Sequence, residues 1–583
     1  MTDYHLPPCP QSDLTPITTT LSDFRVIRKN KFLLVDKTSR INTLLRASKV
    51  FLARPRRFGK TLLLSTIKEL FTNGAKNFEG LAIHDLWDRP CLPVIKVSFF
   101  GLSSPETFEQ ELCARLREAF AQAGFADALQ IKASSFVDLV PELNFLYRNS
   151  DIVLLIDEWD FPLSANLNDR KAFDHNKDIL RRFYSWVREL QNLEFLMVTG
   201  IGRYQDTSLF TGQDIKDISL DPRFANLLGY TQEELESYFS SHISAAAALL
   251  NLKEEQLLEL LKRQYDGFCF DYDAKISVYC PISINNFFLQ VVDFPDRVPV
   301  FGSYWMESSN TAPALRAFLD RKKPSLAFLD SVKGSGIELS QSDLSNAYSF
   351  DELNFNALLT QTGYLSIKQV LRNSPVSIDR IYSCSFPNQE IERIYGPIFL
   401  RYITQSGHHD LDGTWSRQAA QKLSQALYEQ DIARVVAELN VFMCAIPYDL
   451  WADAKEIAYR TFIGWCLQFS IVSDIRYETM NNRGRSDLEF TVNDCTYVIE
   501  LKRLTTKQNT LQDKIKLADV AQQQVYDKGY GFNSHVNGDT QRYGLVLVVS
   551  EHSRQIEYWR YFDGSKVISE GEVAPLSMAN PLN

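Results

Sequence analysis

Four short apolar runs in the first third of the chain predict the strands of one buried sheet. They lie at 48–53, 92–99, 152–156 and 193–200, and helical stretches such as 104–123 separate them. The run at 152–156 shows no alternation of apolar and polar positions, which is typical of a strand that is buried on both faces. Strands that alternate with helices indicate a parallel α/β sheet.

A basic loop follows the first of these runs and leads into a helix. The segment RPRRFGKT (54–61) precedes apolar residues at helical spacing, so the order is strand, loop and helix. In this arrangement backbone amides and the helix N-terminus hold phosphate oxygens, Lys60 would reach the β and γ phosphates, and Thr61 would bind Mg²⁺. Arg54 stands where the usual loop has its first glycine, and on the loop alone a basic turn without nucleotide is an equal alternative.

An acidic pair follows the third apolar run. Asp157 would hold Mg²⁺ through water and Glu158 would polarise the attacking water of a hydrolysis reaction. An ordinary acidic loop after a strand is the alternative, but together with the basic loop the pair favours a nucleotide site. Thr199 ends the fourth run, where it could sense a γ-phosphate, and Arg203 follows it. An arginine in a solvated loop is an equal interpretation for Arg203.

The middle of the chain, about 226 to 440, is predicted to be mostly helical. Thr231 and Glu234 have the spacing of a capping box, which marks the start of a helix. We expect a helical lid over 226–310 and a helical region over 311–440, and the sequence indicates no function for the second. The aromatic segment YDGFCF (265–270) is interpreted as packing.

Near the C-terminus, two alternating runs flank a predicted tight turn at 493–494. If these two residues are the whole turn, Val492 pairs with Cys495, and counting outward places Asp487 opposite Glu500. Opposed side chains have Cβ atoms about 4.5 to 5.5 Å apart and like charges there repel, so this pair needs compensation. A divalent cation would supply it.

Lys502 would share the face of Glu500, because the two are two positions apart on one strand. Oxygen ligands suit Mg²⁺ or Mn²⁺, and Lys502 could orient or help to activate the attacking water. This is the D…E-x-K pattern of metal-dependent phosphodiesterases. Charged residues on an exposed strand face are the alternative, and Glu489 is a reserve ligand if the register is shifted.

In its first half the chain resembles the AAA-ATPase-like proteins of bacteria and archaea that carry a C-terminal PD-(D/E)XK nuclease-like domain. The resemblance rests on FLLVDKTSRINTLL, RPRRFGKT, LLIDEWDFPL, VTGIGRY, GYTQEEL and YDGFCF, in that order. It implies that the loop is a variant beginning with arginine. The nucleotide-binding residues that it implies in the loop are Arg54, Arg56, Arg57, Phe58, Gly59, Lys60 and Thr61. At least one of the three arginines should neutralise nucleotide charge.

The same resemblance covers the C-terminal part. It implies that Glu456 is a metal-binding carboxylate on a helix, beside Asp487 and Glu500, and that Gly484 and Arg485 open the metal-binding strand. A helix with Ala521, Gln524, Lys528 and Tyr530 matches a further motif of the family. Gln524 would contact a substrate phosphate or a metal-bound water, unless it is only an amide on a helix surface. Ser486 replaces the proline of the superfamily's name.

Composition limits the partners. A chain of 583 residues needs several domains, predicted as 1–225, 226–310, 311–440 and 441–583. A formal charge of −10 argues against a generally basic nucleic-acid coat.

Nine cysteines without a C-x-x-C pair are read as reduced core thiols. The start has no apolar leader and the chain no long apolar run, so the cytosol is the expected location, with no membrane partner.

The fold class that follows is α/β and multidomain: a P-loop parallel sheet with a helical lid, a helical middle region and a C-terminal α/β nuclease-like domain. The expected activity is an ATPase joined to a Mg²⁺-dependent nuclease that cuts DNA, controlled by nucleotide state and suited to defence against foreign DNA. A homo-oligomer is compatible with this expectation. One alternative is an ATP-driven switch whose C-terminal domain binds nucleic acid or a partner without cutting, and an RNA substrate is another.

Overall fold

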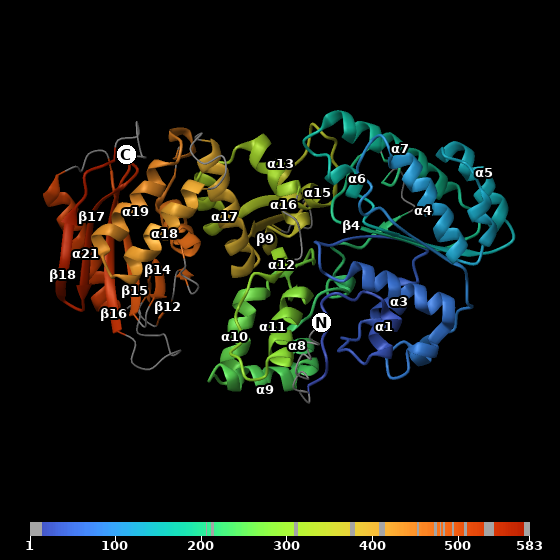
Figure 1. The fold of residues 1–583 in the computed structure, drawn as a ribbon, viewed down its shortest axis with the longest axis horizontal. Helices are drawn as coiled ribbons and strands as arrows, with labels where there is room; N and C mark the ends of the chain where they lie inside the picture. The colour runs from blue at the N-terminus through green and yellow to red at the C-terminus, as the bar shows by residue number, and fades with distance from the viewer. Residues whose placement is uncertain are drawn as a thin grey trace, which may run out of the picture. The chain divides into compact units, whose positions relative to one another are not determined.

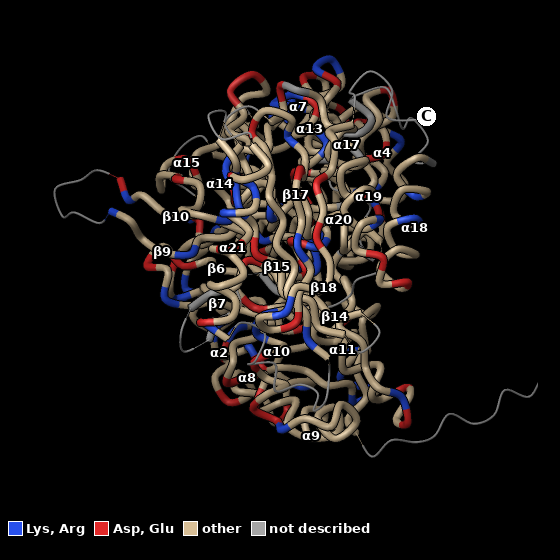
Figure 2. Tube along the Cα trace, turned by 90° about the vertical axis from the view of Figure 1, so that its left-hand side faces the viewer, with Lys and Arg blue, Asp and Glu red and all other residues tan. Residues whose placement is uncertain are grey.

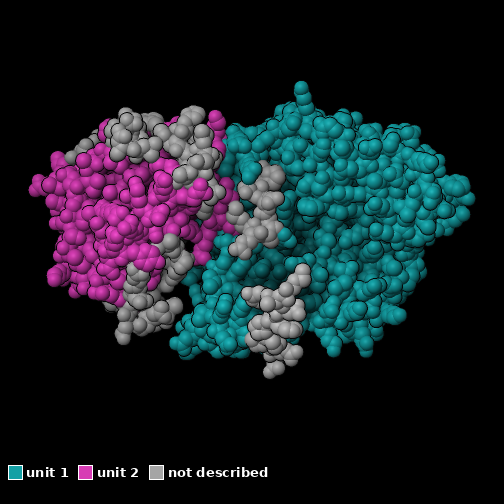
Figure 3. All heavy atoms as spheres, viewed as in Figure 1, with its two compact units in different colours: residues 1–322, 337–392 teal, residues 323–336, 393–583 magenta. Residues whose placement is uncertain are grey.

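The computed structural model describes two compact units. The residues described are 14–205, 207–210, 215–307, 313–372, 379–406, 414–451, 454–470, 475–477, 480–481, 484–492, 495–505, 510–529 and 541–576. The first unit comprises residues 1–322 and 337–392, and the second comprises 323–336 and 393–583 (Figure 3). The four domains expected from the sequence stay a prediction, although the lid and much of the middle region belong to the first unit.

A parallel sheet forms the centre of the first unit. Its order is β2-β3-β4-β1-β5, and every pair is parallel. The strands are β1 (Lys49–Ala53), β2 (Val94–Ser98), β3 (Ile152–Asp157), β4 (Leu193–Gly200) and β5 (Lys216–Asp217). The four strands expected from apolar runs are confirmed. Because β4 lies between β1 and β3, the carboxyl ends of these three strands meet at one edge of the sheet.

Helices cover both faces of this sheet (Figure 1). On one side lie α1 (Phe24–Lys29) and α3 (Lys60–Asn73), and on the other lie α4 (Phe108–Gln122), α5 (Phe136–Tyr147) and α7 (Arg170–Glu189). The shorter helices are α2 (Thr38–Leu44) and α6 (Phe161–Ser164). With both faces covered, all six positions of β3 are buried, as the unbroken apolar run indicates.

The lid of the first unit is a helical cluster. It contains α8 (Gln232–Tyr238), α9 (Ser240–Leu249), α10 (Glu254–Tyr265) and α11 (Pro281–Asp293). The capping box of Thr231 and Glu234 is confirmed at the start of α8. Ile17 and Val35, from the N-terminal segment, are buried in the lid's own apolar core. Lys37 forms an ion pair with Glu234, so two of the sequence signatures meet here.

The YDGFCF segment supports the basic loop. It forms the short strand β6 (Phe268–Cys269), which pairs with β7 (Ser277–Val278). The rings of Phe268 and Phe270 lie 5.0 and 5.2 Å from the ring of Phe58, in edge-on contacts. The segment therefore packs against the basic loop, in agreement with its interpretation as packing.

The middle region contains a sheet that the sequence analysis did not anticipate. Strands β8 (Ile337–Ser340), β9 (Ser366–Arg372) and β10 (Ile381–Ser385) pair in the antiparallel order β8-β10-β9. Runs this short cannot be told from helix segments by periodicity. The helices of this part are α12 (Tyr304–Glu307), α13 (Pro313–Lys322), α15 (Gln341–Ser345) and α16 (Phe355–Thr362).

A six-stranded sheet forms the core of the second unit. Its order is β11-β14-β15-β16-β17-β18, with β15 and β16 parallel and the other pairs antiparallel. The strands are β11 (Ile475–Tyr477), β14 (Leu488–Val492), β15 (Cys495–Leu504), β16 (Gln541–Ser550), β17 (Ile556–Asp563) and β18 (Lys566–Glu572). A separate small hairpin pairs β12 (Met480–Asn481) with β13 (Gly484–Arg485).

Helices α14 (Ala327–Lys333), α17 (Gln389–Ser406), α18 (Thr414–Tyr428), α19 (Ile432–Cys444), α20 (Glu456–Ser470) and α21 (Leu511–Lys528) complete the set. The last of the three boundaries between the units along the chain falls within α17. In the second unit, α21 packs through Ala518 and Ala521 against Val498 and Val548 of the sheet. The strand face that carries Glu500 is therefore covered by a helix rather than exposed.

The predicted hairpin register is confirmed. Val492 pairs with Cys495, and the ladder continues to Leu488 opposite Ile499, which places Asp487 one step beyond the ladder and next to Glu500. The turn at 493–494 lies outside the described residues. Because side chains alternate along a strand, this register sets which residues of β15 face α21.

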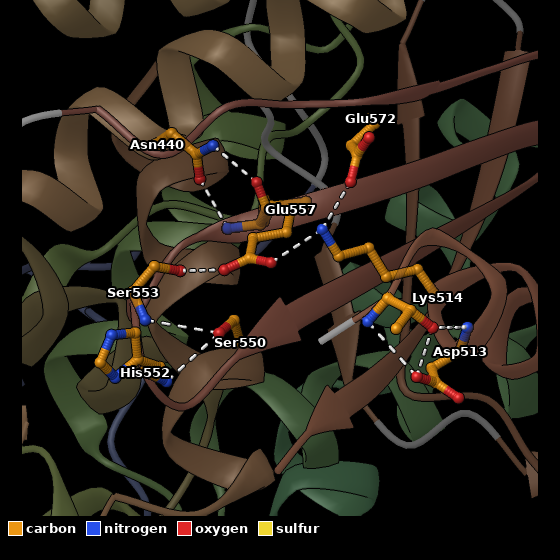
Figure 4. A network of polar contacts seen from close by, with 10 residues as sticks. Asn440, Asp513, Lys514, Ser550, His552, Ser553, Glu557 and Glu572 are labelled. Atoms are coloured by element: carbon orange, nitrogen blue, oxygen red, sulfur yellow. Dashed lines mark hydrogen bonds and ion pairs between the residues drawn. The ribbon is translucent and has the colours of Figure 1, made fainter. Parts of the chain in front are cut away.

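A buried ionic network ties α21 to the sheet (Figure 4). Lys514 Nζ lies 3.0 Å from a carboxylate oxygen of Glu557 on β17 and 2.7 Å from one of Glu572 on β18. Ser553 donates a 2.8 Å hydrogen bond to Glu557. Asn440 of α19 exchanges two hydrogen bonds with the backbone of Ile556 at the start of β17. Polar contacts therefore join both α19 and α21 to β17.

Candidate functional site

The loop between β1 and α3 has a strained, glycine-dependent conformation. Gly59 precedes the helix with φ 92°, and Arg57 has φ 69°, in the left-handed region that side chains rarely adopt. Such strain persists where the surroundings impose it, and it is frequent at ligand-binding loops. The aromatic contacts to Phe58 are one such constraint.

Arg54 does not line the cleft, so its position does not support the expectation that it is one of the nucleotide-binding arginines. Its side chain is buried, and its guanidinium donates to the carbonyl oxygens of Ser219 at 2.6 Å and Phe224 at 3.0 Å. The guanidinium also lies 4.2 Å from the ring centroid of Phe270. The first arginine therefore anchors the loop to the body of the unit, while Arg56 and Arg57 line the cleft.

Lys60, Thr61 and Asp157 meet at the end of the sheet. Lys60 is buried, and its Nζ donates to the carbonyl oxygens of Arg54 and Pro55, both at 2.8 Å. Thr61 Oγ1 donates to one oxygen of Asp157 at 2.7 Å, and Thr199 Oγ1 donates to the other at 2.7 Å. The structure thus brings Lys60 and Thr61 of α3 together with Asp157 of β3, and Thr199 of β4 supports Asp157.

Glu158 and Asp160 complete the acidic end of β3. Glu158 lines the cleft, and its backbone φ is 51°. Burial raises the pKa of its carboxyl group, and the positive charge of nearby Lys60 opposes this rise. Asp160, which the sequence analysis missed, is buried and accepts backbone hydrogen bonds from Ile201 at 3.0 Å and Gly202 at 2.8 Å. It fixes the turn after β4. The signal available in the sequence was a third acidic residue in IDEWD.

Arg203 does not line the cleft, so its position does not support a role in sensing the γ-phosphate. Its side chain is buried in an ion pair with Asp217 at 2.9 Å, and its guanidinium lies 5.4 Å from the ring centroid of Phe51. Asp217 belongs to the edge strand β5. Arg203 therefore holds β5 against the sheet.

A cleft of about 1070 Å³ opens in front of the loop. The loop residues from Arg56 to Thr61 and the pair Asp157 and Glu158 form its polar end. Apolar residues line it elsewhere, namely Leu33, Val35, Leu227, Tyr230 and Ile282. Lys96 of β2 also lines the cleft and was not identified from the sequence. A charged end next to an apolar end suits a ligand with phosphates and an aromatic base.

The second site lies on β14, β15, α20 and α21. Asp487 Oδ2 accepts the backbone N–H of Leu501 at 2.8 Å, which holds it beside the neighbouring strand. Lys502 Nζ lies 2.9 Å from Glu500 Oε1 and 3.3 Å from Gln524 Oε1. The residues expected to share one strand face, together with the glutamine of the following helix, are therefore neighbours.

Glu500 has an unusual environment. Its side chain is 3% exposed, and burial together with the negative charge of Asp487 raises its pKa to about 7, against the opposing effect of Lys502. Its Oε2 is buried and has no hydrogen-bond partner among the described residues. Buried acceptors are rarely left without a donor, so an ion or water is expected at this atom. The residues present thus fit a hard divalent cation.

The helix α20 contributes two charged groups. Burial raises the pKa of Glu456, and the negative charge of Asp487 adds to the rise. Arg460, one turn later, lies with Nη1 3.3 Å from Asp487 Oδ1 and was missed by the sequence analysis. In the part of the chain that the structure describes, no three Asp, Glu, His or Cys side chains are gathered as a ready metal cluster. Basic groups contact two of the carboxylates instead.

The remaining sequence expectations can also be placed. Glu489 accepts a 2.7 Å hydrogen bond from Ser486, and the register is not shifted, so the condition for its role as a reserve ligand is not met. Gly484 and Arg485 form β13, Lys528 ends α21, and Tyr530 lies outside the described residues. Of the described cysteines, all are free and all but Cys91 are buried.

Comparisons with known proteins match a family model in part of each unit. Residues 18–210 match the family model described as a predicted AAA-ATPase, and residues 454–559 match that of the PD-(D/E)XK nuclease superfamily. A relative from Azotobacter chroococcum mcd 1, described as an uncharacterized protein in the vnfD 5′ region, is 26% identical over 530 residues. The match covers 89% of this chain and 93% of the relative. No helix among the described residues has the length and apolar character needed to cross a membrane.

Proposed function

We propose that this chain, which joins an AAA-ATPase-like domain to a PD-(D/E)XK nuclease superfamily domain, is an ATP-hydrolysing enzyme with a metal-dependent nuclease that cuts DNA. The observation that carries the nuclease proposal is the placement of Asp487 beside Glu500, with Lys502 2.9 Å from one Glu500 oxygen. The other oxygen is buried and has no partner among the residues that the structure describes. Water would solvate the carboxylates of a surface cluster, whereas this oxygen is buried.

In the first unit, ATP would lie in the cleft with its phosphates at the loop. The amides of the loop and the N-terminus of α3 would bind the phosphate oxygens, and Lys60 would exchange its two carbonyl partners for phosphate oxygens. Thr61 and Asp157, already 2.7 Å apart, would hold Mg²⁺. Glu158 would accept a proton from the water that attacks the γ-phosphorus, and the bond from that phosphorus to the bridging oxygen would break.

In the second unit, Asp487 and Glu500 would hold Mg²⁺ or Mn²⁺, with Glu456 as a further carboxylate. A bound cation supplies positive charge at the phosphate and lowers the pKa of a coordinated water. Lys502 and Gln524 would orient the attacking water, whose oxygen would form a new bond to phosphorus and give up a proton to solvent. The ester bond to the leaving oxygen would then break, and that oxygen would take up a proton from solvent.

The substrate assignment to DNA is tested directly by cleavage. The full chain should cut plasmid and linear DNA in Mg²⁺ or Mn²⁺ and not in EDTA. Acidic and basic residues are interspersed along the described chain (Figure 2), in keeping with the net charge of −10, so nucleic acid would be held by a local surface. Cutting of RNA but not DNA would favour the RNA alternative.

The rival proposal is an ATP-driven switch whose second unit binds nucleic acid or a partner without cutting. It predicts binding to DNA with no products in any metal. An activity controlled by nucleotide would suit defence against foreign DNA, because an uncontrolled nuclease would also damage the cell's own DNA. That biological role is part of the proposal and follows from the combination of domains alone.

A further inference from the structure

Helix α20 presents two opposite charges to the nuclease centre from the same face. Glu456 and Arg460 are one turn apart, so their side chains are neighbours on the helix surface. Arg460 is 7% exposed, and its Nη1 lies 3.3 Å from Asp487 Oδ1. The hydrogen bond from the Leu501 N–H to Asp487 Oδ2 already holds this carboxylate in place. The buried guanidinium of Arg460 is therefore not needed to position it.

The two basic residues of the centre contact different carboxylates. Lys502 contacts Oε1 of Glu500, and Oε2 has no hydrogen-bond partner in the described part of the chain. Arg460 contacts Oδ1 of Asp487, the oxygen that the Leu501 N–H does not use. A divalent cation shared by Asp487 and Glu500 can approach Glu500 at its open oxygen, but at Asp487 it meets the guanidinium. Two cations on one oxygen repel each other, so the guanidinium and the metal compete for Asp487.

We propose that Arg460 neutralises Asp487 while the metal is absent, is displaced when the metal binds, and then donates to a phosphate of the DNA. This inference rests on the proposed nuclease function. A guanidinium suits both partners, because its planar set of N–H donors matches carboxylate and phosphate geometry alike. Its long side chain can move between them without movement of α20.

The consequence is that metal and DNA bind cooperatively through one side chain. The metal frees Arg460 for DNA, and DNA holds Arg460 away from Asp487, so each ligand strengthens the binding of the other by the same factor. Coupling of this kind changes an affinity by roughly 5- to 150-fold. Removal of a residue that only supports the fold would weaken the binding of both metal and DNA.

The experiment is a pair of titrations on the full chain. Mn²⁺ binding without DNA is measured by calorimetry, and binding of a short labelled duplex is measured by fluorescence anisotropy with and without Ca²⁺, with the duplex checked on a gel for cutting. Arg460→Gln should bind Mn²⁺ about fivefold or more tightly than wild type. The same variant should show weaker duplex binding in Ca²⁺, with the metal's enhancement of duplex binding lost.

Control variants separate the possible failures. Arg434→Gln removes an arginine whose ion pair with Glu429 lies at the surface of the same unit, and it should leave both titrations unchanged. Arg460→Lys keeps the charge and should retain part of the coupling, and Arg460→Met repeats the test if the Gln variant does not fold. Mn²⁺ affinity that is equal or lower in a folded Arg460→Gln or Arg460→Met protein overturns the inference alone. If Asp487→Asn and Glu500→Gln do not change Mn²⁺ binding either, the proposed nuclease centre itself fails.

Discussion

Thr61 Oγ1 donates a 2.7 Å hydrogen bond to Asp157 Oδ2, which joins the first turn of α3 to the end of β3. The two residues are far apart in sequence, and the insertion of β4 between β1 and β3 brings them to one edge of the sheet. A hydroxyl and a carboxylate held at this distance can share one Mg²⁺. The predictions for the first unit start from this pair.

The first prediction concerns nucleotide binding. Lys60→Ala should weaken ATP binding by about 10- to 150-fold, because it removes a charge-assisted contact to phosphate of about 1.5 to 3 kcal/mol. Titration calorimetry in Mg²⁺ measures it. Arg28→Gln is the matched control, because Arg28 bonds to backbone oxygens of Asn77 and Glu79 and lies outside the cleft lining. Equal ATP affinity in wild type and Lys60→Ala would contradict the site.

The second prediction separates hydrolysis from binding. Glu158→Gln keeps the size of the side chain but cannot accept a proton, so turnover should fall by about 10²- to 10⁴-fold while ATP remains bound. Phosphate release measures the first quantity and calorimetry the second. Loss of ATP binding in this variant would instead assign Glu158 to the ligand-binding surface.

The third prediction concerns the nuclease residues. Lys502→Ala should lower DNA cleavage by about 10²- to 10⁴-fold while DNA binding persists, because Lys502 is proposed to act on the attacking water. Glu500→Gln should abolish the metal response as well. Cleavage rates on linear DNA with increasing Mg²⁺ measure both. Cutting that survives both substitutions would place the activity elsewhere in the chain or in a contaminant.

The fourth prediction is that nucleotide controls cutting. ATP can change the nuclease only through its different affinity for two arrangements of the protein. A difference of about 1 to 3 kcal/mol would change the cutting rate roughly 5- to 150-fold. Initial rates are compared without nucleotide, with ATP and with a non-hydrolysable analogue, in wild type and in Glu158→Gln. If all rates coincide while ATP is bound, the two activities are independent.

The fifth prediction concerns stability and pH. Burial alone would raise the pKa of Glu557, but hydrogen bonds from Lys514 and Ser553 bring it below its ordinary value of 4.5. The ionised carboxylate therefore stabilises the folded state above about pH 4.5, and this contribution is lost as the pH falls through the lower folded pKa. Glu557→Gln should cost about 1 to 3 kcal/mol of unfolding free energy at pH 7, and less below pH 4.5.

Urea unfolding at pH 7 and at a pH below about 4.5 measures the unfolding free energy of wild type and Glu557→Gln. Glu551→Gln is the control, because Glu551 forms a more exposed ion pair with Arg503 and should change the unfolding free energy by less than about 1 kcal/mol. A gap between wild type and Glu557→Gln that stays constant with pH would show that the carboxylate charge is not the stabilising group.

The sequence by itself determined much of this protein, because the decisive patterns were local. Apolar runs located β1 to β4, and the unbroken run at 152–156 marked β3 as a strand that is buried on both faces. The strict two-residue period of a strand, counted from one turn, gave the register that puts Asp487 next to Glu500. The resemblance added Glu456 and Gln524, which no spacing alone would have selected.

Only the tertiary structure decided where the long side chains go. Arg54 and Arg203 both lie near the sheet edge, as the motifs suggest, yet neither lines the cleft. Arg54 instead bonds to the carbonyl oxygens of residues 219 and 224, and Arg203 pairs with the carboxylate of Asp217. Arg460 lies in a helix with no motif spacing, and its meaning appears only when α20 packs beside Asp487. A guanidinium takes the acceptors that folding places within its reach, and those acceptors come from distant parts of the chain, which local pattern cannot encode.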